Sequence, residues 1–96
     1  MTYSIIYSPV AMETFDEITE QIKQRWGDRY ADDFKQRAVK VIETIQLSPF
    51  IFQSVESNAD VRKGLIHKNC SIFYKVTDTH ISILFFWDNR QDPVFL

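Results

Sequence analysis

The spacing of apolar residues changes once along this chain, and the change restricts the fold more than any other feature. Between Pro9 and Ser48, apolar side chains recur at intervals of about three to five positions, the repeat of a helix surface. From Phe50 onward they alternate with polar side chains, the repeat of a strand. Helical and strand patterns that occupy separate parts of a chain are typical of an α+β domain, so we predict that fold class.

The helical part divides into two segments. Ser8-Pro9 is a good helix start, because Ser can accept a backbone N–H at the N-cap and Pro has no N–H to leave unpaired. Gly27 suits the left-handed residue that follows a helix, which predicts that the first helix ends at Trp26. Asp28 is the expected N-cap of a second helix, which should end before Ser48-Pro49. Because the linker is so short, we predict an antiparallel hairpin with both apolar faces turned the same way.

Alternating patterns predict one strand before the helices and several after them. Gly64 is expected to mark a bulge in the first long strand. The last strand is apolar on both faces in its second half, which is typical of a strand in the middle of a sheet. The expected extended segments are Tyr3–Tyr7, a short piece at Phe50–Phe52, Val61–His67, Ser71–Val76 and His80–Trp87, with turns at Glu56–Asp60, Lys68-Asn69 and Thr77–Thr79.

Together these segments predict one domain that spans residues 1–96. An N-terminal strand precedes an antiparallel helical hairpin, which packs on one face of a mainly antiparallel sheet of three to four further strands. A chain of 96 residues has the usual length of a single domain. Since one hairpin covers one face of a sheet, we expect a partner to cover the aromatic residues of the other face.

Composition removes several classes of protein. A single Cys70 excludes a disulfide framework, and no apolar run has the length of about 18 residues that a membrane helix needs. The first residues lack the basic and apolar segments of a signal peptide, so we expect a cytoplasmic protein without membrane contact. No pair of Cys or His residues has metal-ligand spacing and no Gly-rich phosphate loop is present, so no metal or cofactor is expected.

The net charge of −2, from 11 basic and 13 acidic residues, hides an uneven distribution. Residues 61–76 contain four basic residues, His67 and no acidic residue. Antiparallel pairing of the last two strands would bring Lys68 and His67 near Arg90 at one end of the sheet. This group is either a set of edge charges that discourages aggregation, or a phosphate or carboxylate site. The four basic residues are Arg62, Lys63, Lys68 and Lys75.

Other residues of a reactive type have ordinary explanations. Nothing in the spacing of His67, His80 and Cys70 orients them as a catalytic triad, so we expect packing or strand-surface roles for all three. The polar side of the first helix carries carboxylates that are expected to be solvated: Glu13, Asp16, Glu17 and Glu20.

The order of these features over nearly the whole chain resembles the RelE/ParE superfamily of bacterial type II toxin–antitoxin toxins. The resemblance implies a small toxin that arrests growth, and an antitoxin that wraps it and covers both its apolar surface and its basic site. The matching residues are Tyr7-Ser8-Pro9, Trp26-Gly27 with Tyr30, Ala31 and Phe34 downstream, Ile45 and Pro49, Val61–Lys63, Ser71–Val76, Ile81–Leu84 and Asp88–Pro93.

The resemblance also implies one of two targets. One branch of the superfamily cuts messenger RNA in the ribosomal A site with a group of Lys and Arg and a C-terminal Tyr, whereas the other binds DNA gyrase. In this chain Ser71 stands where the cutting branch has an Arg, and there is no C-terminal Tyr. We therefore favour the ParE-like, plasmid-stabilisation branch, in which a non-enzymatic toxin inhibits growth by binding gyrase.

Two alternatives stay open. A RelE-like, ribosome-dependent endoribonuclease would act on mRNA with Arg62, Lys63, Lys68 and Arg90. An inactive family member would only bind its antitoxin. In every case we expect the surface that contacts the antitoxin, or a second copy in a homodimer, to include Arg62, Lys68, Phe86, Trp87, Arg90 and Phe95.

Overall fold

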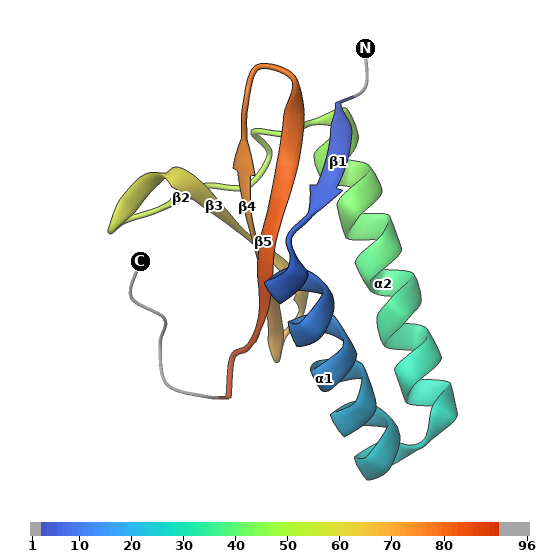
Figure 1. Cartoon of the computed structure of the whole chain (residues 1–96). Coiled ribbons are helices and arrows are strands. Elements are labelled where there is room, and N and C mark those ends of the chain that lie inside the picture. The colour runs from blue at the N-terminus through green and yellow to red at the C-terminus, as the bar shows by residue number, and fades with distance from the viewer. Residues whose placement is uncertain (1–2, 91–96) are drawn as a thin grey trace.

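Two helices lie against one face of a five-stranded sheet in the computed structural model, which describes residues 3–90 (Figure 1). The sheet order is β1-β5-β4-β3-β2, with β1 parallel to β5 and the other neighbours antiparallel. The α+β prediction is therefore confirmed, and β5 lies inside the sheet as predicted. The elements are β1 (Ser4–Tyr7), α1 (Pro9–Trp26), α2 (Asp28–Leu47), β2 (Ser54–Val55), β3 (Asn58–His67), β4 (Cys70–Val76) and β5 (His80–Asp88).

The start of α1 is fixed to a bulge in β5. Leu84 is the extra residue of this bulge, because Phe73 pairs with Phe85 whereas Tyr74 pairs with Ile83. The Ser8 hydroxyl accepts the Ala11 N–H at 2.9 Å as the N-cap of α1, and it donates to the Leu84 carbonyl at 2.6 Å. One turn further along α1, the Thr14 hydroxyl accepts the Phe86 N–H at 2.9 Å. The helix thus supplies hydrogen bonds to backbone groups around the bulge.

The core lies between the helices and the inner face of the sheet. Tyr74 is fully buried, and its hydroxyl donates to the Pro49 carbonyl at 2.8 Å, which satisfies the polar atom and holds the end of α2. The Phe15 ring of α1 lies 5.5 Å from the Phe34 ring and 5.2 Å from the Phe86 ring. The largest fully buried apolar side chains beside Tyr74 are Ile45, Ile72, Ile81 and Ile83.

Two element boundaries differ from the sequence prediction. Gly27, with a φ of 95°, is the N-cap of α2, and Asp28 is the first helical residue without a side-chain capping bond. The backbone reverses between the helices at this positive φ, which glycine adopts at little cost. Segment Phe50–Phe52 forms turns and bends, and the short strand follows it at Ser54–Val55.

The first long strand also differs in two details. It begins at Asn58, within the segment expected to be a turn, and its bulge is at Ile66 instead of Gly64. Gly64 pairs regularly with Ile72, and a Cβ atom there would lie 2.9 Å from the Phe52 ring. Close packing of the loop after α2, and not a bulge, therefore accounts for this glycine. In residues 3–90, no helix has the length and apolarity of a membrane span.

Candidate functional site

The helical hairpin extends past the end of the sheet (Figure 1) and leaves an open cleft of about 610 Å³. The cleft lies between the hairpin, the turn that joins β3 to β4, and the end of β5. Its apolar side is formed by residues of both helices, including Ile18, Ile22, Trp26, Tyr30 and Phe34. Its charged side comes from all three parts: Asp33, Arg37, Lys40, His67, Lys68, Asp88 and Arg90.

The predicted group of Lys68, His67 and Arg90 is brought together in this cleft. The bulge at Ile66 interrupts the alternation of β3, so His67 lines the cleft beside Lys68. The Asn69 N–H donates to His67 Nδ1 at 3.3 Å, which leaves Nε2 to carry the proton of the neutral ring. Partial burial and the charges of Arg37 and Lys68 hold the pKa of His67 below its usual value.

Arg90 is bound to the carboxylate of Asp88. Its Nε donates to Oδ1 at 3.0 Å, its Nη2 to Oδ2 at 2.7 Å, and its backbone N–H to Oδ1 at 2.9 Å. Hydrogen bonds from Arg90 hold the pKa of Asp88 below its usual value. The Arg90 guanidinium carbon also lies 5.9 Å from the centre of the Trp26 ring, so this pair joins the end of the sheet to the end of α1.

Asn89 holds the turn that carries His67 and Lys68. Its backbone N–H donates to the Asn69 carbonyl at 2.8 Å, and its side-chain oxygen accepts the Ser71 hydroxyl at 2.9 Å. Ser71 is completely buried, so the serine that stands in place of an arginine has a structural role in this chain. These bonds fix the β3–β4 turn against the end of β5.

The remaining reactive side chains are engaged in packing or in local hydrogen bonds. Burial raises the pKa of the Cys70 thiol to about 12, so the thiol stays protonated near neutral pH and is a poor nucleophile. His80 Nδ1 lies 3.1 Å from the Thr77 hydroxyl and 3.0 Å from that of Thr79, and its Nε2 lies 3.1 Å from the Ser82 hydroxyl. It is the first residue of β5, and these contacts hold the β4–β5 turn beside it.

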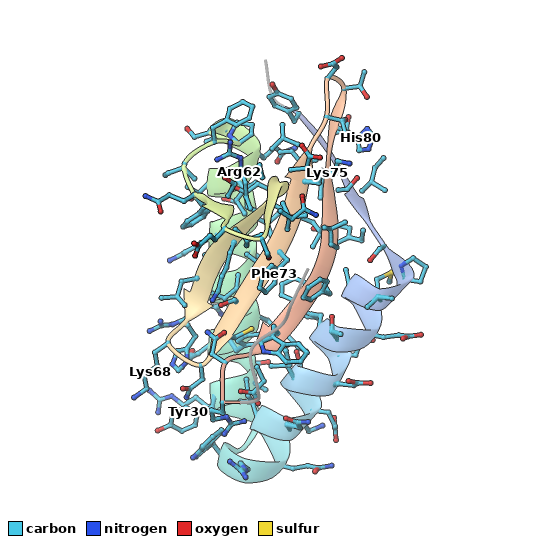
Figure 2. All side chains as sticks on the ribbon, turned by 90° about the vertical axis from the view of Figure 1, so that its left-hand side faces the viewer. Tyr30, Arg62, Lys68, Phe73, Lys75 and His80 are labelled. Carbon is cyan, nitrogen blue, oxygen red and sulfur yellow. The ribbon has the colours of Figure 1, made fainter. Side chains whose placement is uncertain are left out.

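The four residues predicted as an RNA-cleaving set do not form one group. Arg62 and Lys68 lie toward opposite ends of the molecule (Figure 2). Arg62 donates to the Phe52 carbonyl at 2.7 Å and lies 4.8 Å from the Phe50 ring centre, which ties it to the loop after α2. Lys63 lies on the opposite face of β3, and only Lys68 and Arg90 line the cleft.

The sheet face turned away from the helices, here called the outer face, is aromatic. Phe73 and Phe85 stack there with ring centres 4.6 Å apart, and the Lys63 ammonium lies 5.9 Å from the Phe73 ring centre. Trp87 pairs with buried Ser71 on this face and is half-buried, and Leu65 is 54% exposed.

Phe86 was predicted to contribute to a partner surface, but it is only 3% exposed and packs against Phe15 in the core. The bulge at Leu84 turns Phe86 toward the helices, so that prediction is wrong. Phe95 lies outside the described residues.

Comparison with known protein families identifies the family of this chain. The model of the family described as "ParE toxin of type II toxin-antitoxin system, parDE" matches residues 5–93. The chain belongs to the ParE toxin family. It is thus a type II toxin by family, within the RelE/ParE superfamily that the sequence resembles.

Solved structures with the ParE-family fold resemble this toxin at low sequence identity. A chain of the chromosomal ParDE system from P. aeruginosa has a TM-score of 0.77 at 18% identity, covering 91% of this chain and 96% of that chain. The YoeB dimer from Staphylococcus aureus gives 0.67 at 18%, covering 91% and 97%. The E. coli DinJ-YafQ complex gives 0.65 at 11%, covering 94% and 96%. No curated protein sequence matches the chain.

Sequence reasoning missed the contribution of α2 to the cleft of this ParE-family toxin. Arg37 and Lys40 face the β3–β4 turn from α2, on the same side as Tyr30 and Asp33. The available signal was helical spacing, because Arg37 and Lys40 lie three and six positions beyond Phe34 and flank the apolar stripe. What the sequence did not reveal is that the hairpin overhangs the end of the sheet.

Proposed function

We propose that this toxin arrests growth by binding DNA gyrase, and that a cognate antitoxin neutralises it. The match of the ParE family model to residues 5–93 is the observation that carries this proposal. The similarity in fold to the P. aeruginosa ParDE chain agrees with it. A role in plasmid stabilisation and action in the cytoplasm belong to the same proposal.

Three of the described reactive groups are engaged in other contacts, which favours binding over catalysis by them. Arg90 is bound to Asp88, the Cys70 thiol is protonated, and the Tyr74 hydroxyl is buried in a bond to Pro49. A general acid or base must reach the proton that it transfers, and these groups are already engaged. An inhibitor that works by occupying a surface needs none of them.

The antitoxin is proposed to cover the outer face. Leu65, Phe85 and Trp87 are partly or largely exposed there, beside the Phe73–Phe85 stack. Apolar and aromatic side chains are the usual centre of a protein interface. The E. coli DinJ-YafQ structure with this fold is a toxin-antitoxin complex, and the YoeB dimer makes a second copy the alternative occupant.

The decisive experiment measures gyrase directly. Purified toxin is added to a supercoiling reaction, alone and after mixing with its antitoxin, and cells are examined after induced expression. We expect loss of supercoiling, reversal by the antitoxin, and filamentous cells with DNA-damage signalling. Growth arrest with unchanged supercoiling would contradict the gyrase proposal.

The outer face also favours a second candidate, a ribosome-dependent endoribonuclease. An ammonium group beside an aromatic ring suits single-stranded RNA, because the partly exposed Phe85 ring can stack on a base and Lys63 can approach a phosphate, whereas Phe73 is only 4% exposed. Primer extension on translated messages would then show new cuts inside codons, and Lys63→Gln would reduce them. Intact messages during growth arrest would rule out this candidate. Unaffected growth with a stable antitoxin complex would instead indicate an inactive member.

A further inference from the structure

We propose that the cleft beside the helical hairpin binds a small aromatic phosphate of the size and chemistry of a mononucleotide. This inference does not rest on the proposed function, which uses the outer face and the family match. It rests on three features that the cleft combines: unpaired positive charge, exposed aromatic rings, and a fixed shape large enough for such a ligand.

Positive charge converges on the cleft from two elements. Within residues 3–90 the ion pairs are Lys23–Asp28 and Arg90–Asp88, so Arg37, Lys40 and Lys68 have no carboxylate at ion-pair distance. The neutral ring of His67 offers a further N–H at Nε2. Phosphate suits such a group, because it accepts hydrogen bonds from several donors at once.

The opposing charges in the cleft are few. Asp88 is neutralised by Arg90, and Asp33 is the other carboxylate of the lining. Arg37 of α2 and Lys68 of the β3–β4 turn both lower the pKa of His67, so these two cations lie near the same ring. The local potential is therefore positive on a chain whose net charge is −2.

Aromatic rings flank this charge. Trp26 and Tyr30 lie at the hairpin end of α1 and α2, and they remain 49% and 59% exposed. Rings that stay exposed beside an anion subsite suit stacking with a flat base, which contributes about 1–3 kcal/mol per base. Ile22 and Phe34 provide the apolar side of the lining. An inorganic anion would use only half of this site.

Size and rigidity fit a mononucleotide. The volume of about 610 Å³ falls within the range of about 300–1,000 Å³ that is usual for small-ligand sites. The Asn89 hydrogen bonds hold the β3–β4 turn before any ligand arrives. A site that is already ordered loses little conformational freedom on binding, which favours affinity.

The test is calorimetric titration of the purified full chain with AMP, adenosine, inorganic phosphate and a short oligoribonucleotide, combined with amide NMR shifts. We expect AMP to bind and to shift residues 26–30 and 67–69. Adenosine and phosphate alone should each bind at least about 10-fold more weakly, a difference of about 1.4 kcal/mol. The oligoribonucleotide should bind no more tightly than AMP.

Variants assign the site. Arg37→Gln, Lys68→Gln and Trp26→Ala, all at exposed positions, should each weaken AMP binding about 10-fold or more. Arg37→Gln and Lys68→Gln should do so without lowering the melting temperature, whereas Trp26→Ala also removes the contact with Arg90. Lys75→Gln is the matched control, an exposed lysine of β4 outside the cleft lining. The proposal is overturned by no AMP binding, by an equal loss in Lys75→Gln, by phosphate as tight as AMP, or by an oligoribonucleotide about 10-fold tighter than AMP.

Discussion

Among single residues, Asp88 carries the strongest electrostatic constraint that the described structure shows. Its side chain is 9% exposed and accepts hydrogen bonds from both the guanidinium and the backbone of Arg90. Asp88→Asn should lower the free energy of unfolding at pH 7 by about 1–2 kcal/mol, at the low end for bonds to charged groups because Arg90 is partly exposed. Urea denaturation of both proteins measures the difference.

The same pair has a defined pH dependence. Because Arg90 holds the pKa of Asp88 below its unfolded value of about 3.9, its contribution is complete above that pH and is lost as pH falls through the folded pKa. The stability difference between wild type and Asp88→Asn should therefore shrink below about pH 4. A difference that stays constant down to about pH 2 would contradict the role of the ionised pair.

His67 is a second residue whose protonation is coupled to folding, and it is a base whereas Asp88 is an acid. Its pKa is lowered, so the unfolded state takes up the proton first, and stability falls as pH drops through about 6.5 toward the folded pKa. NMR titration should give a midpoint below about 6.5. Arg37→Gln or Lys68→Gln should raise that midpoint, because each removes a nearby positive charge, whereas Lys75→Gln should leave it unchanged.

At the scale of elements, local signals predicted the helices better than the strand faces. Ser8, Pro9 and Gly27 stop and start helices through their own backbone chemistry, so the bounds of α1 were predictable. The bulge at Leu84 was not, because its carbonyl accepts a hydrogen bond from Ser8, far away in the sequence. The bulge at Ile66 lies beside a short turn, but no residue type in the sequence marks it. One extra residue reverses the side-chain alternation beyond it. That reversal placed Phe86 in the core and His67 in the cleft.

Gly64 packs closely against the loop after α2, so a larger side chain at this position should disturb the contact between β3 and that loop. Gly64→Ala should destabilise the protein by about 1–3 kcal/mol, because its Cβ would lie 2.9 Å from the Phe52 ring and 3.1 Å from Ile72 Cγ2. In the background of Phe52→Ala the same substitution should cost clearly less. A double-mutant cycle by urea denaturation measures this coupling.

Gly27→Ala is the matched contrast. Nothing lies within 4 Å of a Cβ at Gly27, so its cost comes from the φ of 95° and not from a neighbour. Phe52→Ala should therefore leave the cost of Gly27→Ala unchanged. Rescue of both glycine variants by Phe52→Ala, or of neither, would contradict the steric explanation for Gly64.

For the whole molecule, the sequence predicted which layers exist but not how they are offset. Separate helical and strand patterns predicted two layers, and the aromatic content of the strands predicted that the second face of the sheet carries apolar side chains. The overhang of the hairpin depends on the pairing of β1 with β5 and on the fixed start of α1. Neither is local in sequence, and so the cleft and the part of Arg37 in it emerged only in three dimensions.

The offset of the layers gives the toxin two separate surfaces, the outer face and the cleft. If the antitoxin covers the outer face, Leu65→Ser and Trp87→Ala should weaken its binding. Loss of a central contact worth about 2 kcal/mol corresponds to a decrease in affinity of about 30-fold. Leu65 is 54% exposed, so its substitution leaves the fold intact. Trp26→Ala, in the cleft, should leave antitoxin affinity unchanged.

Two measurements check this division of surfaces. Calorimetry gives the affinities, and thermal denaturation gives the rise in melting temperature that a partner binding only the folded toxin must produce. The rise should be smaller for Leu65→Ser than for wild type at equal antitoxin concentration, because the weaker complex contributes less stabilisation. If Trp26→Ala abolishes the rise while both outer-face variants retain it, the antitoxin occupies the cleft, and a small ligand there would compete with neutralisation.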